Sequence, residues 1–98
     1  MGPESRFKVR VLKALRAISP SWWVKVHGSA FGAAGTPDIL GCLRGRFCAL
    51  ELKRDAKARV TPLQERNINL IHEAGGLSRI VSPEVWDETL EDLNEWRK

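Results

Sequence analysis

Residues 35–53 read GTPDILGCLRGRFCALELK, and this stretch decides the fold. The Arg44-Gly45 pair is the expected turn between two strands, because glycine suits the positive φ angles of a two-residue hairpin loop. Followed back along both strands, a two-residue loop places Asp38 directly opposite Glu51. A three-residue loop would shift the pairing by one residue and send the two carboxylates to opposite faces. The stretch therefore predicts a hairpin with two acids facing each other near its open end.

Lys53 follows Glu51 by two residues, so its side chain is expected on the same face of the strand. Two facing carboxylates repel unless positive charge lies between them. Lys53 can supply part of that charge, and a divalent cation can supply more because hard cations prefer several oxygen ligands. Apolar neighbours such as Ile39 and Leu50 indicate buried strands, where carboxylates need partners. The alternative is an ordinary surface hairpin with scattered charges.

A helix is predicted over residues 4–18, because apolar residues recur at helical spacing from Phe7 to Ile18. Glu4 precedes Phe7 by three residues and therefore falls on the inward stripe. It is either a first-turn acid that favours the helix dipole or a third oxygen ligand aimed at the same site.

The rest of the chain supplies four more elements. Residues 22–27 alternate as a strand and bring two adjacent tryptophans, one of which is expected at an edge or partner surface. His27 is interpreted as a strand-end hydrogen-bonding residue, with a catalytic base as the alternative, and residues 28–35 form a small-residue loop. Thr61 to Gln64 predict a capping box that opens a helix whose buried side carries Leu63, Leu70, Ile71 and Ala74. A strand over 77–81 and an acidic helix towards Trp96 follow.

These elements give the order α-β-β-β-α-β plus a C-terminal helix, in a mixed α/β (α+β) fold. The length of 98 residues suits one domain over 1–98, with a core at about 3–82 and the acidic helix at about 83–97. No segment is apolar for long enough to span a membrane, and the charged N-terminus is unlike a signal peptide. Cys42 and Cys48 lack zinc-site spacing, which favours a reducing compartment, the cytoplasm.

Charge is distributed unevenly along the chain. Residues 1–66 carry 13 Lys and Arg against 5 Asp and Glu, whereas residues 67–98 carry 3 against 7. This asymmetry favours a polyanionic partner such as nucleic acid, the alternative being a merely basic protein with a solvated surface. Six basic residues are the candidate phosphate contacts: Arg6, Arg10, Lys13, Arg54, Lys57 and Arg59.

With this element order, Pro37-Asp38 and Glu51-Leu52-Lys53 resemble the motif of the PD-(D/E)XK nuclease superfamily. The chain is more closely similar to the VRR-NUC (virus-type replication-repair nuclease) domain in its short stand-alone phage form. The resemblance covers roughly residues 3–82, and it also includes Pro3-Glu4, Thr61 to Gln64 and Ala74 to Gly76.

The resemblance implies roles for individual residues. Asp38 and Glu51 match the metal-binding carboxylates, with the backbone carbonyl of Leu52 as a further ligand and Glu4 as the glutamate of the first helix. Lys53 matches the lysine that positions or activates the attacking water, and Gln64 matches a glutamine that supports the site.

The implied activity is Mg²⁺- or Mn²⁺-dependent hydrolysis of phosphodiester bonds in branched DNA, above all four-way (Holliday) junctions, by a homodimer without a small-molecule cofactor. A flap or single-strand nuclease, an enzyme that acts on RNA and a non-catalytic DNA-binding module are the alternatives. The last of these would keep the acids as charge pairs with Lys53.

Overall fold

The computed structural model describes residues 2–26 and 34–98. Its elements are, in chain order, α1 (Pro3–Arg16), β1 (Ser21–Lys25), β2 (Ile39–Leu43), β3 (Arg46–Leu52), α2 (Pro62–Glu73), β4 (Leu77–Val81) and α3 (Pro83–Glu95). The predicted order and the mixed fold class are therefore confirmed. The first strand ends at Lys25, and both His27 and most of the small-residue loop lie outside the described residues.

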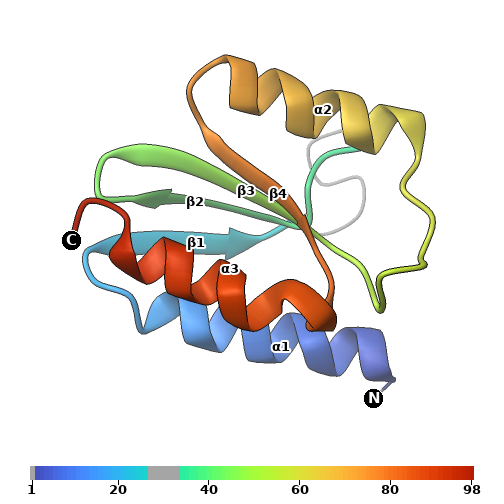
Figure 1. The fold of residues 1–98 in the computed structure, drawn as a ribbon, viewed down its shortest axis with the longest axis horizontal. Helices are drawn as coiled ribbons and strands as arrows, with labels where there is room; N and C mark the ends of the chain where they lie inside the picture. The colour runs from blue at the N-terminus through green and yellow to red at the C-terminus, as the bar shows by residue number, and fades with distance from the viewer. Residues whose placement is uncertain (1, 27–33) are drawn as a thin grey trace.

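The four strands form one sheet in the order β1-β2-β3-β4. The first three strands are antiparallel neighbours, and β4 lies parallel to β3 at the sheet edge. Parallel strands need a crossover connection, and α2 provides it. Figure 1 shows α2 on one side of the sheet and α1 and α3 together on the other.

The β2–β3 hairpin has the tight turn that the sequence predicts. The Arg44-Gly45 turn has positive φ angles of 47° and 87°, which match the primed turns that suit the twist of a hairpin. Its register pairs Ile39 with Leu50. Continued by one residue, this register sets Asp38 opposite Glu51, and the two carboxyl groups are in contact, so the predicted facing of the two acids is confirmed.

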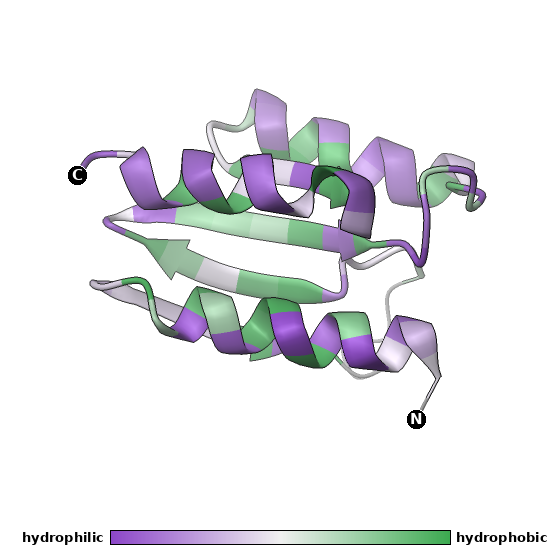
Figure 2. Cartoon of the chain, turned by 60° about the horizontal axis from the view of Figure 1, so that its bottom comes forward, coloured by the Kyte–Doolittle hydropathy of each residue, from purple (hydrophilic) through white to green (hydrophobic). Residues whose placement is uncertain are grey.

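The hydrophobic core lies between the sheet and the α1–α3 layer. Trp23 is only 3% exposed on this face, and Gly41 lies beside it on β2. A Cβ atom added to Gly41 would lie 2.4 Å from the Trp23 ring, so glycine is required for the tryptophan to pack here. Figure 2 shows apolar strands behind the mostly polar outer surface of α3. Trp86 and Leu93 of α3 belong to the same core.

The prediction for the buried side of α2 is wrong for three of its four residues. Leu63, Leu70 and Ala74 are exposed, Ile71 is half-buried, and Ile68 is the buried residue of this helix. Two polar residues, Gln64 and Asn67, also lie on the inward side, next to Ile68. Gln64 hydrogen-bonds to the side chains of Glu51 and Lys53, and Asn67 donates to the backbone carbonyl of Gly35. The inward stripe of α2 is therefore partly polar, which a search for apolar periodicity does not find.

Candidate active site

The predicted site residues gather at one edge of the molecule. Figure 1 shows the N-terminal ends of α1 and α2 and the C-terminal ends of β1 and β3 on the right-hand side of the view. Asp38 lies just before β2, and Glu51 is the second-last residue of β3. At this edge, the start of α1 on one face of the sheet and the start of α2 on the other face lie beside the open end of the hairpin.

Asp38 and Glu51 form a close pair of carboxyl groups. Asp38 Oδ2 accepts a hydrogen bond of 2.7 Å from the Leu52 backbone N–H, which fixes this carboxylate beside β3. Glu51 is only 4% exposed. Burial, together with the neighbouring charge of Asp38 and a hydrogen bond to it, raises the pKa of Glu51 to about 7. The two acids therefore lie close enough for the charge of Asp38 to disfavour ionisation of the buried Glu51.

Lys53 and Gln64 support Glu51 from the other side. Lys53 Nζ donates to Gln64 Oε1 at 2.8 Å and lies 3.7 Å from Glu51 Oε2. Gln64 Nε2 donates to the same Glu51 oxygen at 3.3 Å. Gln64 also completes the predicted capping box, because its Oε1 accepts from the Thr61 N–H at 3.0 Å while its own N–H donates to Thr61 Oγ1 at 3.2 Å. One glutamine thus starts α2 and holds the lysine against Glu51.

Glu4 does not join the carboxyl pair directly. Its carboxylate lies 3.8 Å from Lys8 Nζ, and the same ammonium lies 3.5 Å from Asp38 Oδ1. Within residues 2–26 and 34–98, no three His, Cys, Asp or Glu side chains are arranged to hold a metal ion. Asp38 and Glu51 are therefore the two carboxyl groups that lie side by side here, and the Lys8 ammonium lies between Asp38 and Glu4.

The sequence did not single out Lys8, which lies beside Asp38 in the structure. Its spacing of four residues from Glu4 signals an ion pair on one helix face. Its reach to Asp38 depends on how α1 packs against the sheet, which the local pattern does not contain.

The six candidate phosphate contacts are all exposed: Arg6, Arg10, Lys13, Arg54, Lys57 and Arg59. Three lie on α1, and three lie in the irregular segment between β3 and α2. Arg10 stacks its guanidinium 5.4 Å from the Phe7 ring centre, and Arg54 pairs with Asp55 at 3.4 Å. None of these basic side chains is buried, so their charges are accessible to a ligand.

The pKa of Glu51 predicts how the stability of the metal-free protein depends on pH. Because the folded-state pKa of about 7 exceeds the ordinary value of 4.5, the folded state holds the proton more tightly than the unfolded state. This contribution is complete below pH 4.5 and is lost as the pH rises towards 7. For the wild type, the free energy of unfolding should fall by about 2 kcal/mol over this pH range because of Glu51. Glu51→Gln, which mimics the protonated form, should not show this fall. Urea unfolding in EDTA at both ends of this range measures it, and equal losses in the two proteins would contradict the account.

No family model matches the sequence, and no curated protein matches it significantly. A solved structure described as "VRR_NUC domain" covers 93% of this chain and 97% of its own, with a TM-score of 0.78 and 25% identity. A second, described as "VRR_NUC domain protein", covers 98% of this chain and 88% of its own, with a TM-score of 0.75 and 17% identity.

The resemblance to the VRR-NUC domain is confirmed. The match to VRR-NUC structures extends over almost the whole chain, beyond the region of roughly 3–82 on which the sequence motifs lie. A weaker likeness, with a TM-score of 0.47 and 16% identity, is to Hjc, a Holliday junction resolvase from Archaeoglobus fulgidus, over 82% of this chain and 65% of that one. Among the described residues, no helix has both the length and the apolar composition needed to cross a bilayer.

Proposed function

We propose that this chain is a divalent-metal-dependent endonuclease that hydrolyses phosphodiester bonds in branched DNA. The observation that carries the proposal is the convergence of Asp38, Glu51 and Lys53 at one edge of a VRR-NUC fold. Their contacts agree with the roles that the sequence motif implies for them. Two carboxyl groups held side by side, one of them almost fully buried, supply the oxygen donors that a divalent metal ion prefers.

Asp38 and Glu51 are the proposed ligands of Mg²⁺ or Mn²⁺, since hard divalent ions bind carboxylate oxygens. The Leu52 carbonyl is a further candidate, because the N–H of the same residue already points to Asp38 and both groups of a strand residue point to one side. Glu4 is the proposed third acid. When bound, such an ion makes coordinated water more acidic and offsets charge on the transferring phosphoryl group.

Lys53 is the proposed group that orients the attacking water and adds positive charge near the phosphate. Its ammonium is held by the side-chain oxygen of Gln64, which leaves further N–H donors for water or phosphate. Gln64 acts through Lys53 and Glu51, so it is a positioning residue. Arg6, Arg10, Lys13, Arg54, Lys57 and Arg59 are proposed to contact phosphates away from the scissile bond, which orients the DNA without reading its sequence.

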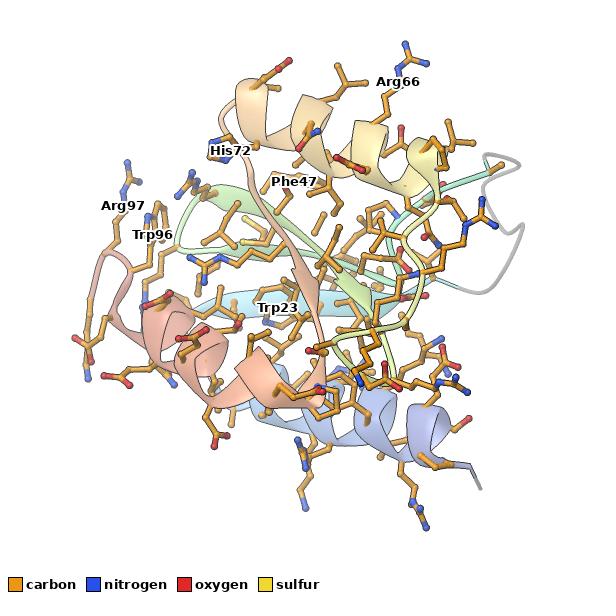
Figure 3. All side chains as sticks on the ribbon, turned by 45° about the vertical axis from the view of Figure 1, so that its right-hand side comes forward. Trp23, Phe47, Arg66, His72, Trp96 and Arg97 are labelled. Atoms are coloured by element: carbon orange, nitrogen blue, oxygen red, sulfur yellow. The ribbon has the colours of Figure 1, made fainter. Side chains whose placement is uncertain are left out.

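A homodimer is proposed because resolving a four-way junction takes paired cuts in two of its four strands, and a two-fold axis supplies two matched sites. The face of the sheet that bears α2 offers a surface for it. Trp22, Cys42 and Phe47 are cross-strand neighbours on that face, and Trp22 and Phe47 are 64% and 49% exposed. Figure 3 shows Phe47 and Trp23 on opposite sides of the sheet. Trp23 and Trp86 are buried and are therefore not part of this surface.

Trp22→Arg should therefore weaken the dimer. Large aromatic side chains near the centre of an interface often contribute the most, so we expect a dissociation constant at least about 30-fold higher. Val9→Arg is the matched control, because Val9 is also exposed but lies on α1 on the opposite side of the sheet. Sedimentation equilibrium measures both variants. Equal dimer strength in wild type and Trp22→Arg would reject this surface.

The proposed function is tested by incubating the protein with four-way, flap, nicked and single-stranded DNA, and a matched RNA junction, in Mg²⁺, in Mn²⁺ and in EDTA. We expect metal-dependent cuts, with the four-way junction as the preferred substrate. Preference for flaps or single strands would favour a flap or single-strand nuclease. Preference for the RNA junction would show that the substrate is RNA and not DNA. Salt-sensitive binding without cleavage of any substrate would leave the non-catalytic DNA-binding module as the function.

A further inference from the structure

Lys8 is a second lysine at the candidate active site, in addition to the motif lysine Lys53. Its ammonium lies between two acids, 3.8 Å from Glu4 Oε1 and 3.5 Å from Asp38 Oδ1. Its side chain is 23% exposed, so most of it is packed against the protein. Lys53 is already engaged by Gln64 and Glu51, and each acid of the pair therefore has an ammonium of its own.

The backbone of Lys8 is held in place by the core. Its neighbour Phe7 and the residue one turn on, Val11, are both buried. The Phe7 ring meets Trp86 of α3 edge to face, with 6.5 Å between the ring centres. These contacts fix α1 on the sheet, so the lysine stem starts from a defined point beside Asp38.

The ammonium itself is held less tightly than the backbone. Distances of 3.5 and 3.8 Å are ion-pair distances longer than a good hydrogen bond to a carboxylate. Lysine also has a flexible four-carbon stem and a compact charge that can change partners. The arrangement therefore joins a fixed helix to a cation that can move.

We propose that Lys8 is the resident counter-ion of this site. In the metal-free protein its ammonium neutralises Glu4 and Asp38 and competes with a divalent cation for Asp38. Once displaced, the same ammonium is free to contact a phosphate of bound DNA. This inference rests on the proposed function, because it concerns the same metal-binding acids.

Two effects of opposite sign follow for Lys8→Gln. Removing a positive charge beside Asp38 should tighten Mn²⁺ binding about tenfold, since like charges at such distances repel strongly. Losing a phosphate contact should slow single-turnover cleavage of a four-way junction at saturating Mn²⁺ about 10-fold or more. A residue that only holds the fold would weaken both binding and cleavage when replaced.

Isothermal titration of Mn²⁺ into wild type, Lys8→Gln, Lys8→Arg and Lys98→Gln tests the inference. Lys98→Gln removes the same charge from an exposed residue at the C-terminus, and Lys8→Arg keeps the charge at the site. We expect tighter binding in Lys8→Gln alone. Equal or weaker Mn²⁺ binding in Lys8→Gln, with wild type binding and cutting normally, would overturn the role of Lys8 but not the proposed function.

A second measurement avoids dependence on one variant. If Lys8→Gln does not fold, wild-type protein labelled with ¹³C at the lysine ε-carbons is titrated with Mg²⁺. The Lys8 signal should shift as the ammonium leaves Asp38, and an unchanged signal at metal saturation would overturn the inference. Wild-type protein that binds neither Mg²⁺ nor Mn²⁺ would instead reject the proposed function, and the role of Lys8 with it.

Discussion

Asp38→Asn is expected to lower the rate of DNA cleavage by on the order of 10³-fold or more, while DNA binding persists. Asparagine has nearly the same size as aspartate and keeps an oxygen that can accept the Leu52 N–H, so the backbone geometry is retained. The change removes the negative charge that attracts a divalent cation to this position. The loss should therefore fall on chemistry rather than on folding.

Asp55→Asn is the matched control for this experiment. Asp55 lies in the exposed segment after β3 and accepts the Lys57 N–H, a contact that asparagine also keeps. Single-turnover rates in Mg²⁺ and DNA affinities in Ca²⁺ are compared for the two variants. Cleavage by Asp38→Asn at a rate close to that of Asp55→Asn would remove this acid from the site.

Lys53→Met is expected to slow cleavage by about 10²- to 10³-fold, because it removes the ammonium nearest to Glu51. Methionine preserves much of the apolar stem, so the packing of β3 changes little. Glu51 loses its lysine partner but keeps the Gln64 hydrogen bond. DNA affinity should change by much less than the rate.

Lys57→Met provides the comparison for charge alone. Lys57 is exposed in the neighbouring segment, and as a phosphate contact it should affect DNA affinity and its salt dependence more than the cleavage rate. Pre-steady-state cleavage and filter binding separate the two quantities. If both lysine variants lose affinity and retain the rate, Lys53 is a DNA contact and not part of the chemistry.

The pairing of Asp38 with Glu51 was predictable because the hairpin is local. A glycine at the second turn position favours the two-residue loop, and strand periodicity then determines which side chains share a face. The capping box was predictable for the same reason, since Thr61 and Gln64 are separated by only three residues. Both features of the site follow from short-range chemistry.

The position of Lys8 and the rotation of α2 depend on contacts between distant segments. Lys8 reaches Asp38 because the buried apolar residues of α1, Phe7, Val11 and Leu15, pack this helix against the sheet. The inward side of α2 is set by hydrogen bonds from Gln64 to the strand residues and from Asn67 to the Gly35 carbonyl. Apolar periodicity alone misjudged this helix, because the side that faces the site is polar.

A manganese-soaked crystal of the wild-type protein tests the central claim most directly. An anomalous difference map should show a peak coordinated by the carboxylates of Asp38 and Glu51, with the Lys8 ammonium moved away from Asp38. Crystals of Asp38→Asn soaked in the same way should lack the peak. A map at saturating Mn²⁺ with no peak between these two carboxylates in the wild type would contradict the account.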